Sequence, residues 1–575
     1  MKKTKKVNLS RHKFYTLFTA GTISFAVSTI AGFLDNIVSG NFLGEAAISA
    51  VGLVTPIFTI VCFISTLFAN GAANYYTEAV GEFDKKKAYE IFGTAIIASI
   101  ALGVIMMVSL FFLEDAIINW FGVGEEISDY CHQYFKYFIL LSLIQPMDWL
   151  LFAIVYNDGD QNCTIVSDVF KVGTNIIFAI IFCSLMGVAG VSLARVISTV
   201  IAMIILCCHF FRKQNSLKVR FVFKTKYCPT IVKYSAVIAF GYLFTAILNI
   251  AMNEFVVEMF GEFYIPVVNV IMFVFSIITV CSSNGTAITP FVCVYLSEKN
   301  MPGLKNIMNA GLWVAIIEGV VITLLFMIFG DFVSVIYGIT TPALVDMASV
   351  AIRWASVCIV FASIIYLYVQ YYVVAGHAVL SVVFSGLFMT VAPIWRLYLF
   401  GYLWGQIPGW AGWGLSFGLA FIICVIVVFI MGGKKKFPLL IDDFGTNTKN
   451  YNFVLSAEAF AEVNKEIVDF LKENNIANKS VQKASLLIEE MGVKIQDFNK
   501  DHKGKILIEI SVQLDPQHPG KVFIVVRDNG KFLDVTDEDS AVTSLNSYML
   551  ASYMRAVQDK TYVKTIGFNR SHYEI

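Results

Sequence analysis

The sequence predicts a membrane all-α protein of twelve transmembrane helices, followed by a C-terminal cytoplasmic α/β sandwich domain. Hydrophobic residues make up 57% of the 575-residue chain and charged residues only 15%, whereas about a quarter of the residues are charged in a typical soluble domain. Hydrophobic runs long enough to cross a bilayer, about 20 residues each, recur to about residue 431. From about residue 438 the sequence becomes charged and periodic, as in a soluble domain.

The basic segments predict how the spans are oriented. Each lies after an even number of predicted spans, whereas the acidic loop LEDAIINWFGVGEEISD lies after an odd number. Because loops rich in Lys and Arg stay in the cytoplasm, both termini and the C-terminal domain are predicted to be cytoplasmic, in a multi-pass plasma-membrane protein. The basic segments are the N-terminus, EFDKKK (82–87), RKQNSLKVRFVFKTK (212–226), SEKNMPGLK (297–305) and GGKKK.

Charge and cysteine usage exclude several classes of function. The chain has 42 basic and 42 acidic residues, so no nucleic-acid partner is predicted. Its eleven cysteines are scattered through apolar runs without metal-ligand or redox spacing, and they are interpreted as buried free thiols. No P-loop occurs, so no Walker-type ATPase is predicted. No catalytic residue, metal or cofactor is predicted.

The membrane part repeats itself. Residues 42–60 (FLGEAAISAVGLVTPIFTI) align with residues 259–277 (MFGEFYIPVVNVIMFVFSI), and Gly159 is mirrored by Gly376, 217 residues later in both cases. ANGAA also matches SNGTA at the corresponding place in the second half. Many secondary transporters build two lobes around a central site by such duplication. The predicted parts are a first lobe (1–215), a second lobe (216–435), a linker (436–451) and a soluble domain (452–575).

Three segments of the first half follow an ordered pattern. They are FLDNIVSGNFLGEAAISAVGL, the DG of YNDGDQN, and TNIIFAIIFCSLMGVAGVSLARVIS. They resemble the multidrug and toxic compound extrusion (MATE) family, which has an Asp in the first span, an lG-alaa turn, an rnDG loop and N-I-x-L-D before GvxGaAlATvi. The resemblance covers about residues 14–431. It implies two six-helix lobes forming a V-shaped cleft, and exchange of Na⁺ or H⁺ against an organic, often cationic, substrate.

The resemblance also implies an ion-coupling site, and here the chain departs from the family. Asp35 occupies the place of the first-span carboxylate, and Asn175 matches the fifth-span Asn. The family's Asp four residues after that Asn falls on Ala179, and the Thr of ATvi falls on Arg195. Two members of the implied cation site are therefore missing.

A charged guanidinium inside an apolar span needs a partner or a route to water, because it cannot neutralise itself. Arg195 lies eight residues after the outer-turn Gly187, and Asp35 lies nine residues before the outer-turn Gly44. At 1.5 Å per helical residue, both lie on the order of 12 Å below their outer turns. We therefore expect Arg195 to pair with Asp35 in place of a bound cation; the alternative is an arginine that extends to the outer headgroups.

The second lobe supplies Asn249 and Asn253 as candidates for the substrate cleft and Glu254 as a candidate for ion coupling. Some branches of the family couple through a seventh-span Glu, which is the position of Glu254. The alternative is that Glu254 lies near the outer interface and faces water. In the fifth span, Asp168 and Lys171 are three residues apart and are expected to neutralise each other.

From Asn452 the order is strand, helix, helix, strand, strand, helix and strand, from the change between periods of two and 3.6. This order resembles the ATP-binding domain of histidine kinases and anti-sigma-factor kinases. Glu490 matches the family's catalytic Glu, and Asp528 and Gly530 match the D-x-G loop that binds adenine. Lys494 stands where the family has a Mg²⁺-binding Asn, and the lid region lacks glycines. Because Mg²⁺ needs hard oxygen ligands, the nucleotide site is predicted to be degenerate.

These observations predict a secondary exporter of organic compounds coupled to Na⁺ or H⁺, embedded in the lipid bilayer, with a regulatory cytoplasmic domain. A cytoplasmic regulatory protein is a predicted partner of that domain. Two alternatives remain open. One is a sensor that binds a ligand and signals through the C-terminal domain without transport. The other is a flippase for lipid-linked precursors.

Overall fold

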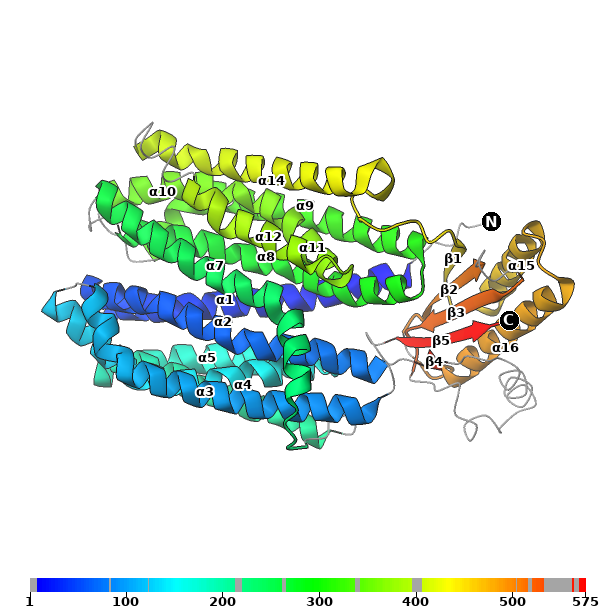
Figure 1. The fold of residues 1–575 in the computed structure, drawn as a ribbon, viewed down its shortest axis with the longest axis horizontal. Coiled ribbons are helices and arrows are strands. Elements are labelled where there is room, and N and C mark those ends of the chain that lie inside the picture. The colour runs from blue at the N-terminus through cyan, green and yellow to red at the C-terminus, as the bar shows by residue number, and fades with distance from the viewer. Residues whose placement is uncertain are drawn as a thin grey trace. The chain divides into compact units, whose positions relative to one another are not determined.

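The computed structural model describes residues 8–81, 84–121, 124–212, 220–260, 265–336, 342–395, 406–502, 504–514, 520–531, 561–562 and 568–575. Long helices fill the chain up to residue 436 (Figure 1). They are α1 (Leu9–Leu43), α2 (Glu45–Gly81), α3 (Lys85–Phe121), α4 (Glu125–Asn157), α5 (Gln161–Met186), α6 (Val188–Cys207), α7 (Cys228–Phe260), α8 (Ile265–Ser297), α9 (Met301–Ile336), α10 (Pro342–Ser356), α11 (Cys358–Val374), α12 (Ala378–Gly386) and α14 (Gln406–Lys436). Short turns η1 (Cys208–Phe211) and η2 (Thr225–Tyr227) lie between α6 and α7, and a π-helical turn, η4 (Leu387–Val391), extends α12.

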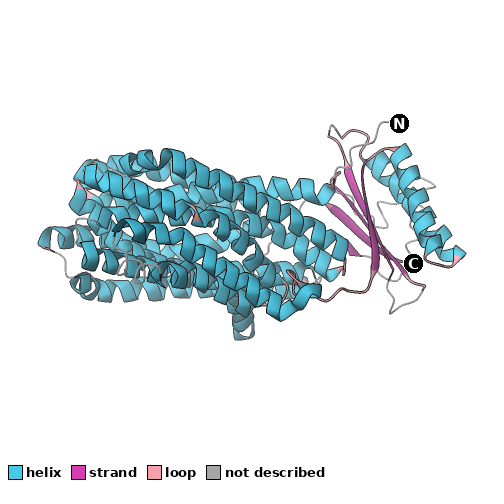
Figure 2. Cartoon of the chain, turned by 90° about the horizontal axis from the view of Figure 1, so that it is seen from above, coloured by secondary structure: helices cyan, strands magenta, loops and turns pink. Residues whose placement is uncertain are grey.

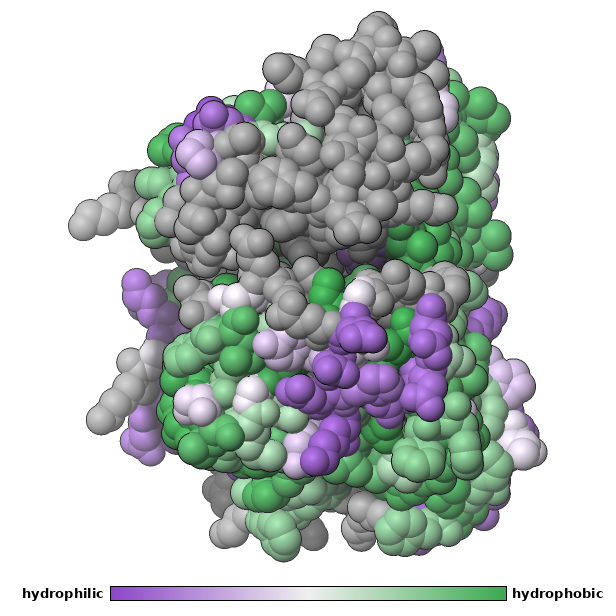
Figure 3. All heavy atoms as spheres, turned by 90° about the vertical axis from the view of Figure 1, so that its left-hand side faces the viewer, coloured by the Kyte–Doolittle hydropathy of each residue, from purple (hydrophilic) through white to green (hydrophobic). Residues whose placement is uncertain are grey.

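Among the described residues, ten helices are long and apolar enough to cross a bilayer, or eleven if the bent pair Thr225–Ala236 and Ile238–Met252 is one span. Their exposure differs as expected for a bundle in lipid. In α8, 71% of the apolar window is buried, whereas in α9 only 22% is. A view onto one end of the molecule shows hydrophilic side chains gathered on the end face and apolar side chains beside them (Figure 3). The prediction of many membrane-spanning helices is confirmed; the count of twelve stays a prediction.

The two turn glycines that the predicted repeat pairs have the same backbone conformation. Gly159, after α4, and Gly376, after α11, both have positive φ, +92° and +88°. Each glycine N–H bonds the carbonyl three residues before it, and the N–H of the following residue bonds the carbonyl five residues before its own. Glycine adopts this conformation without the steric penalty that a Cβ would bring. The same turn therefore closes corresponding helices in the two halves.

The chain forms two compact units. The larger unit comprises Ala20–Thr286 and Leu312–Met431, and the other comprises Met1–Thr19, Ala287–Gly311 and Gly432–Ile575. In the larger unit, α2 packs closely against α7. The helices approach so closely at Gly71 that a Cβ there would lie only 1.9 Å from the Ile231 carbonyl oxygen. The amide N–H of Gly71 also donates to Ser235 Oγ at 2.6 Å.

The C-terminal part of the second unit is a five-stranded antiparallel sheet with helices α15 (Ala457–Glu473) and α16 (Asn478–Phe498) on one face (Figure 2). The strand order is β1-β2-β3-β5-β4. The strands are β1 (Asn447–Val454), β2 (Leu507–Leu514), β3 (Val522–Asp528), β4 (Thr561–Tyr562) and β5 (Asn569–Glu574). Apolar side chains from alternate strand positions and from both helices form its core.

Two details differ from the sequence prediction. β1 begins at Asn447, inside the predicted linker, and the strand predicted over the last residues is divided into β4 and β5. The helix predicted between the last strands lies outside the described residues.

Candidate functional site in the first six helices

A buried carboxylate on α1 is the centre of the candidate site. Asp35 is 1% exposed, and Arg195 of α6 donates from Nη1 to Asp35 Oδ2 at 3.0 Å. The hydroxyl of Tyr134, on α4, donates to the same oxygen at 3.1 Å. Asn175 of α5 lies at the limit of a hydrogen bond, with Nδ2 3.5 Å from Asp35 Oδ1. Four helices thus meet at one carboxylate, and the structure brings together Asp35, Asn175 and Arg195.

The guanidinium of Arg195 is also held on its flat face. Its Cζ lies 4.0 Å from the ring centroid of Phe58, on α2, a favourable cation–π distance. The Arg195 side chain is 17% exposed. An arginine that extended to headgroups would leave these partners, so its orientation favours the pair over the alternative expected from sequence.

The position that lacks the family's second carboxylate is fully packed. Ala179 is 0% exposed and lies in an apolar cluster with Cys183 and Ala194. The described site therefore contains one carboxylate and one fixed positive charge, together with neutral phenol and amide groups. The positive guanidinium would repel a free cation at this site, and the described site has no second carboxylate to offset that repulsion.

The pair expected between Asp168 and Lys171 is wrong. Lys171 Nζ instead lies 2.5 Å from Asp148 Oδ2, on α4. Asp168 accepts a hydrogen bond from Ser24 Oγ on α1. Both side chains therefore connect α5 to a neighbouring helix, Lys171 to α4 and Asp168 to α1.

A second buried cluster lies at the turn between α4 and α5. The ring of His209 is 0% exposed, with Nε2 2.8 Å from Asp158 Oδ2 and Nδ1 2.9 Å from Asp160 Oδ2. Asp160 also accepts from Arg212 at 2.7 Å and from the Cys163 N–H at 3.2 Å, which caps α5. The cluster fastens the end of α6 to the start of α5. The two acids are visible in the DG loop, but nothing in the sequence marks a histidine fifty residues away as their partner.

In the second lobe, the predicted cleft residues do not form a described cluster. Asn249 donates from Nδ2 to the carbonyl oxygen of Thr245, one turn earlier on α7, at 3.1 Å. The side chains of Asn253 and Glu254 lie outside the described residues. Sequence reasoning missed Glu318 on α9: both of its carboxylate oxygens are buried, without a hydrogen-bond partner among the described residues. A lone Glu within an apolar helix was the signal that could have found it.

The residues of the predicted nucleotide site lie on two elements, α16 and the end of β3. Glu490 and Lys494 are one turn apart on α16, and both are partly buried. Asp528 ends β3, is 4% exposed, and accepts from Asn569 Nδ2 at 2.8 Å and the Gly530 N–H at 2.9 Å. Burial raises the pKa of Asp528 to about 6, although both hydrogen bonds lower it. The segment 532–560, which contains the predicted lid, lies outside the described residues.

The second face of the sheet carries a buried charge network. Arg527 of β3 is 0% exposed; its Nη1 lies 2.8 Å from Glu509 Oε1 on β2, and its Nη2 donates to Glu298, just after α8. Glu298 also binds Arg570 of β5 at 2.6 Å. The Tyr295 hydroxyl, in the last turn of α8, donates to Glu509 Oε1 at 2.9 Å. The sheet, the end of α8 and the start of α9 are therefore parts of one packed unit.

A MatE family model matches residues 22–181. The multidrug export protein MepA of Staphylococcus saprophyticus is 26% identical over 205 residues, which are 34% of this chain and 46% of MepA. This chain thus matches less than half the length of the curated relatives. The segment matched by the family model contains Asp35 and Asn175.

Solved transporter structures share the fold over a longer stretch. A multidrug resistance MATE family transporter of the MOP superfamily, in an outward-facing conformation, aligns with a TM-score of 0.66 and 18% identity over 74% of this chain and 96% of its own. A MOP superfamily transporter from Pyrococcus furiosus, described as having a binding pocket of reverse polarity that suggests a different function, aligns with a TM-score of 0.64 and the same identity and coverage. Residues 22–181 therefore carry the sequence pattern of the MatE family, and about three quarters of the chain has the fold of the MATE transporters of the MOP superfamily.

Proposed function

We propose that the protein is a secondary-active exporter that moves small organic, drug-like compounds out of the cytoplasm. The matched family segment, the transporter fold and the similarity to multidrug export proteins support this proposal. In this proposal the chain has twelve spans in two lobes around a cleft, with both ends in the cytoplasm. The basic segments support that orientation.

One observation carries the mechanistic part of the proposal: the fixed Arg195–Asp35 pair. A carboxylate that holds a guanidinium at 3.0 Å has no need of a mobile cation, because the arginine already supplies one positive charge. Ion coupling through the first lobe is then weak. The second lobe, or the charge of the substrate itself, carries the coupling.

Two carboxylates of the second lobe are candidates for that coupling. Glu254 is the candidate from the family resemblance. Glu318 is the candidate from the structure, because both oxygens are buried without a partner among the described residues. A buried carboxylate without a counter-ion favours its protonated form. Glu318 therefore suits H⁺ better than Na⁺.

Flux into inverted membrane vesicles tests the function. A panel of fluorescent organic cations and amphiphiles is offered under an imposed H⁺ or Na⁺ gradient. We expect H⁺-driven uptake that falls strongly in Glu318→Gln and is unchanged in the matched control Asp331→Asn, whose carboxylate is 62% exposed. Absence of flux for every compound under both gradients would contradict the transporter proposal.

The first lobe offers a gain-of-function test. Arg195→Thr with Ala179→Asp restores the two side-chain types that the family pattern has at these positions. We expect the double variant to acquire a Na⁺ dependence that the unmodified chain lacks, in addition to the H⁺ dependence carried by Glu318. A reporter fused after Lys435 tests the proposed topology, since activity only outside the cytoplasm would contradict it.

A sensor is the second candidate function. The observation that favours it is the network of Arg527, Glu298 and Glu509, which packs the C-terminal sheet against the end of α8. Such a contact can transmit ligand binding in the membrane part to the cytoplasmic domain. Ligand-dependent hydrogen exchange in β2 and β3, without flux of that ligand, would favour the sensor over the exporter. In either case the domain is regulatory, and a cytoplasmic protein is its proposed partner.

A further inference from the structure

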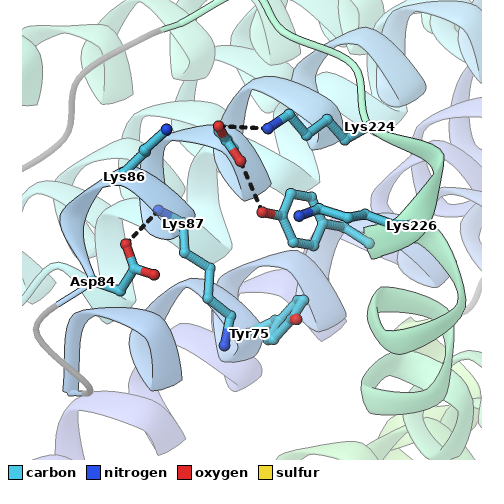
Figure 4. Close-up of a pocket in the computed structure, with 8 residues that line it drawn as sticks. Tyr75, Asp84, Lys86, Lys87, Lys224 and Lys226 are labelled. Carbon is cyan, nitrogen blue, oxygen red and sulfur yellow. Dashed lines mark hydrogen bonds and ion pairs between the residues drawn. The ribbon is translucent and has the colours of Figure 1, made fainter.

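The strongest unassigned feature of the larger unit is a pocket lined by lysines. Its volume is about 480 Å³, and it lies between the end of α2, the start of α3 and the turn η2 that precedes α7. Figure 4 shows its lining side chains. They are Tyr75, Asp84, Lys86, Lys87, Glu90, Lys224, Lys226 and Tyr227.

The acidic side chains of the pocket are already engaged. Asp84 accepts the backbone N–H of Lys87 at 2.9 Å, at the start of α3. Glu90 is 8% exposed and binds Lys224 Nζ at 2.6 Å and the Tyr227 hydroxyl at 2.8 Å. The lining therefore has two more positive than negative charges, and its anionic groups are occupied.

Two of the remaining lysines are exposed and the third is partly buried. Lys86 and Lys226 are exposed, and Lys226 Nζ lies 4.7 Å from the Tyr227 ring centroid. Lys87 Nζ lies 4.9 Å from the ring centroid of Tyr75. Aromatic rings thus support two of the ammonium groups.

The segment that carries Lys224 and Lys226 is held against α3. The Lys224 N–H donates to Thr94 Oγ1 at 3.1 Å, and Thr94 Oγ1 lies 3.3 Å from the Val222 carbonyl oxygen. The backbone approaches so closely that a Cβ at Gly93 would lie 1.8 Å from the Arg220 carbonyl oxygen. The lysines from two distant parts of the sequence are therefore arranged by the fold before any ligand arrives.

The position of the pocket along the candidate membrane spans indicates the source of its ligand. The candidate membrane spans of α2 and α3 are Ala50–Ala79 and Lys86–Asn119, so the pocket lies where the first span ends and the second begins. That is the level of lipid headgroups, where clusters of lysines bind anionic lipids. We propose that this pocket binds a phosphate-bearing anion, with the headgroup of an anionic phospholipid as its source. A soluble phosphate has the same chemistry and is separated from the lipid by experiment.

The test uses the full chain in non-ionic detergent. Phosphatidylglycerol, phosphatidylcholine or inorganic phosphate is titrated, and the thermal unfolding midpoint and the number of lipids retained in native mass spectrometry are measured. We expect phosphatidylglycerol to raise the midpoint more than phosphatidylcholine, with an effect that weakens as salt increases. If inorganic phosphate alone also raises the unfolding midpoint, the pocket recognises the phosphate group. If it does not, the pocket recognises the complete lipid.

The test variant is Lys86→Gln with Lys226→Gln. These two lysines are chosen because the groups bonded to the Glu90 carboxylate are Lys224 and Tyr227, so the double change leaves those bonds in place. A loss of about thirtyfold in apparent affinity for phosphatidylglycerol is expected, from about 1 kcal/mol for each of the two lysines near the surface. Lys86→Arg with Lys226→Arg keeps both charges and should retain binding. The matched control is Lys305→Gln with Lys434→Gln, two exposed lysines of other basic segments. Equal losses in the control pair, or no loss in the pocket pair, would overturn the proposal.

Discussion

Arg195 Nη1 lies 3.0 Å from Asp35 Oδ2, so that α6 and α1 are joined by a buried ion pair. Neither charge is stable alone at this depth, because removing an ion from water costs several kcal/mol. The Tyr134 hydroxyl and the Phe58 ring add a hydrogen bond and a cation–π contact. The two charges therefore stabilise each other, and the cost of removing one depends on whether the other is still present.

The first prediction concerns the stability of this pair. Arg195→Ala should lower the free energy of unfolding by about 3–5 kcal/mol, because it leaves Asp35 as a buried, unpaired carboxylate. Arg195→Ala with Asp35→Asn should be milder than Arg195→Ala alone, since no buried charge remains. Thermal unfolding of the purified protein in detergent measures each change.

A matched pair in the second lobe provides the control. Arg353 binds Asp331 at 3.0 Å, but the two side chains are 44% and 62% exposed. Arg353→Ala should therefore cost at most about 1 kcal/mol. Strict additivity of the Arg195 and Asp35 changes would mean that the two charges do not stabilise each other.

The depth argument from sequence predicted which residue Arg195 approaches, because two spans of one lobe place nearly equal numbers of residues, eight and nine, between each charge and its turn. The same reasoning could not find the partner of Lys171. Its partner Asp148 comes from α4, and the rotation of one helix against another is set by packing rather than by spacing. The His209 cluster was invisible for the same reason.

The C-terminal sheet shows another limit. The alternation in β2 and β3 correctly predicted strands, but it did not show what lies against their polar side. Glu509 and Arg527 lie on that side, yet they are 1% and 0% exposed. Residues from α8 and from the start of the chain, including Ser10, cover them, with Ser10 Oγ 2.8 Å from Glu509 Oε2. A period of two identifies a face but does not identify what covers it.

The second prediction tests this covered face. Arg527→Met removes the cation between Glu298 and Glu509 and should destabilise the unit by about 3–5 kcal/mol. The expected result is faster proteolysis within residues 447–575 of the full chain. Lys521→Met, which breaks a more exposed pair with Glu574 at the rim of the same sheet, is the control and should change proteolysis little. Equal rates for the two variants would contradict a stabilising role for the network.

The third prediction concerns pH. Burial raises the pKa of Asp528 from 3.8 to about 6, so the folded domain favours the protonated carboxyl. Its stabilising contribution is fully present below about pH 4 and is lost as pH rises through about 6. The change corresponds to about 3 kcal/mol.

Asp528→Asn isolates this contribution, because the amide oxygen can still accept from Asn569 and the Gly530 N–H while carrying no charge. The ratio of proteolysis rates between the unmodified chain and the variant should rise between pH 4 and 7. Using the ratio at each pH removes the pH dependence of the protease itself. A ratio that stays constant across this range would show that Asp528 does not titrate in the folded domain as expected.

The fourth prediction is that the C-terminal domain does not hydrolyse ATP or phosphorylate a protein at a useful rate. Lys494 stands one turn after Glu490 on α16, where the resembling kinases have a Mg²⁺-binding Asn. An ammonium group cannot coordinate a cation and repels it. ATP hydrolysis by the full chain should therefore be no faster with Mg²⁺ than without it.

Lys494→Asn should increase Mg²⁺-dependent nucleotide binding if the rest of the pocket is intact, and Lys494→Gln controls for loss of charge with a longer amide. Mg²⁺-dependent turnover by the unmodified chain that disappears in Glu490→Ala would show that the domain is an active ATPase.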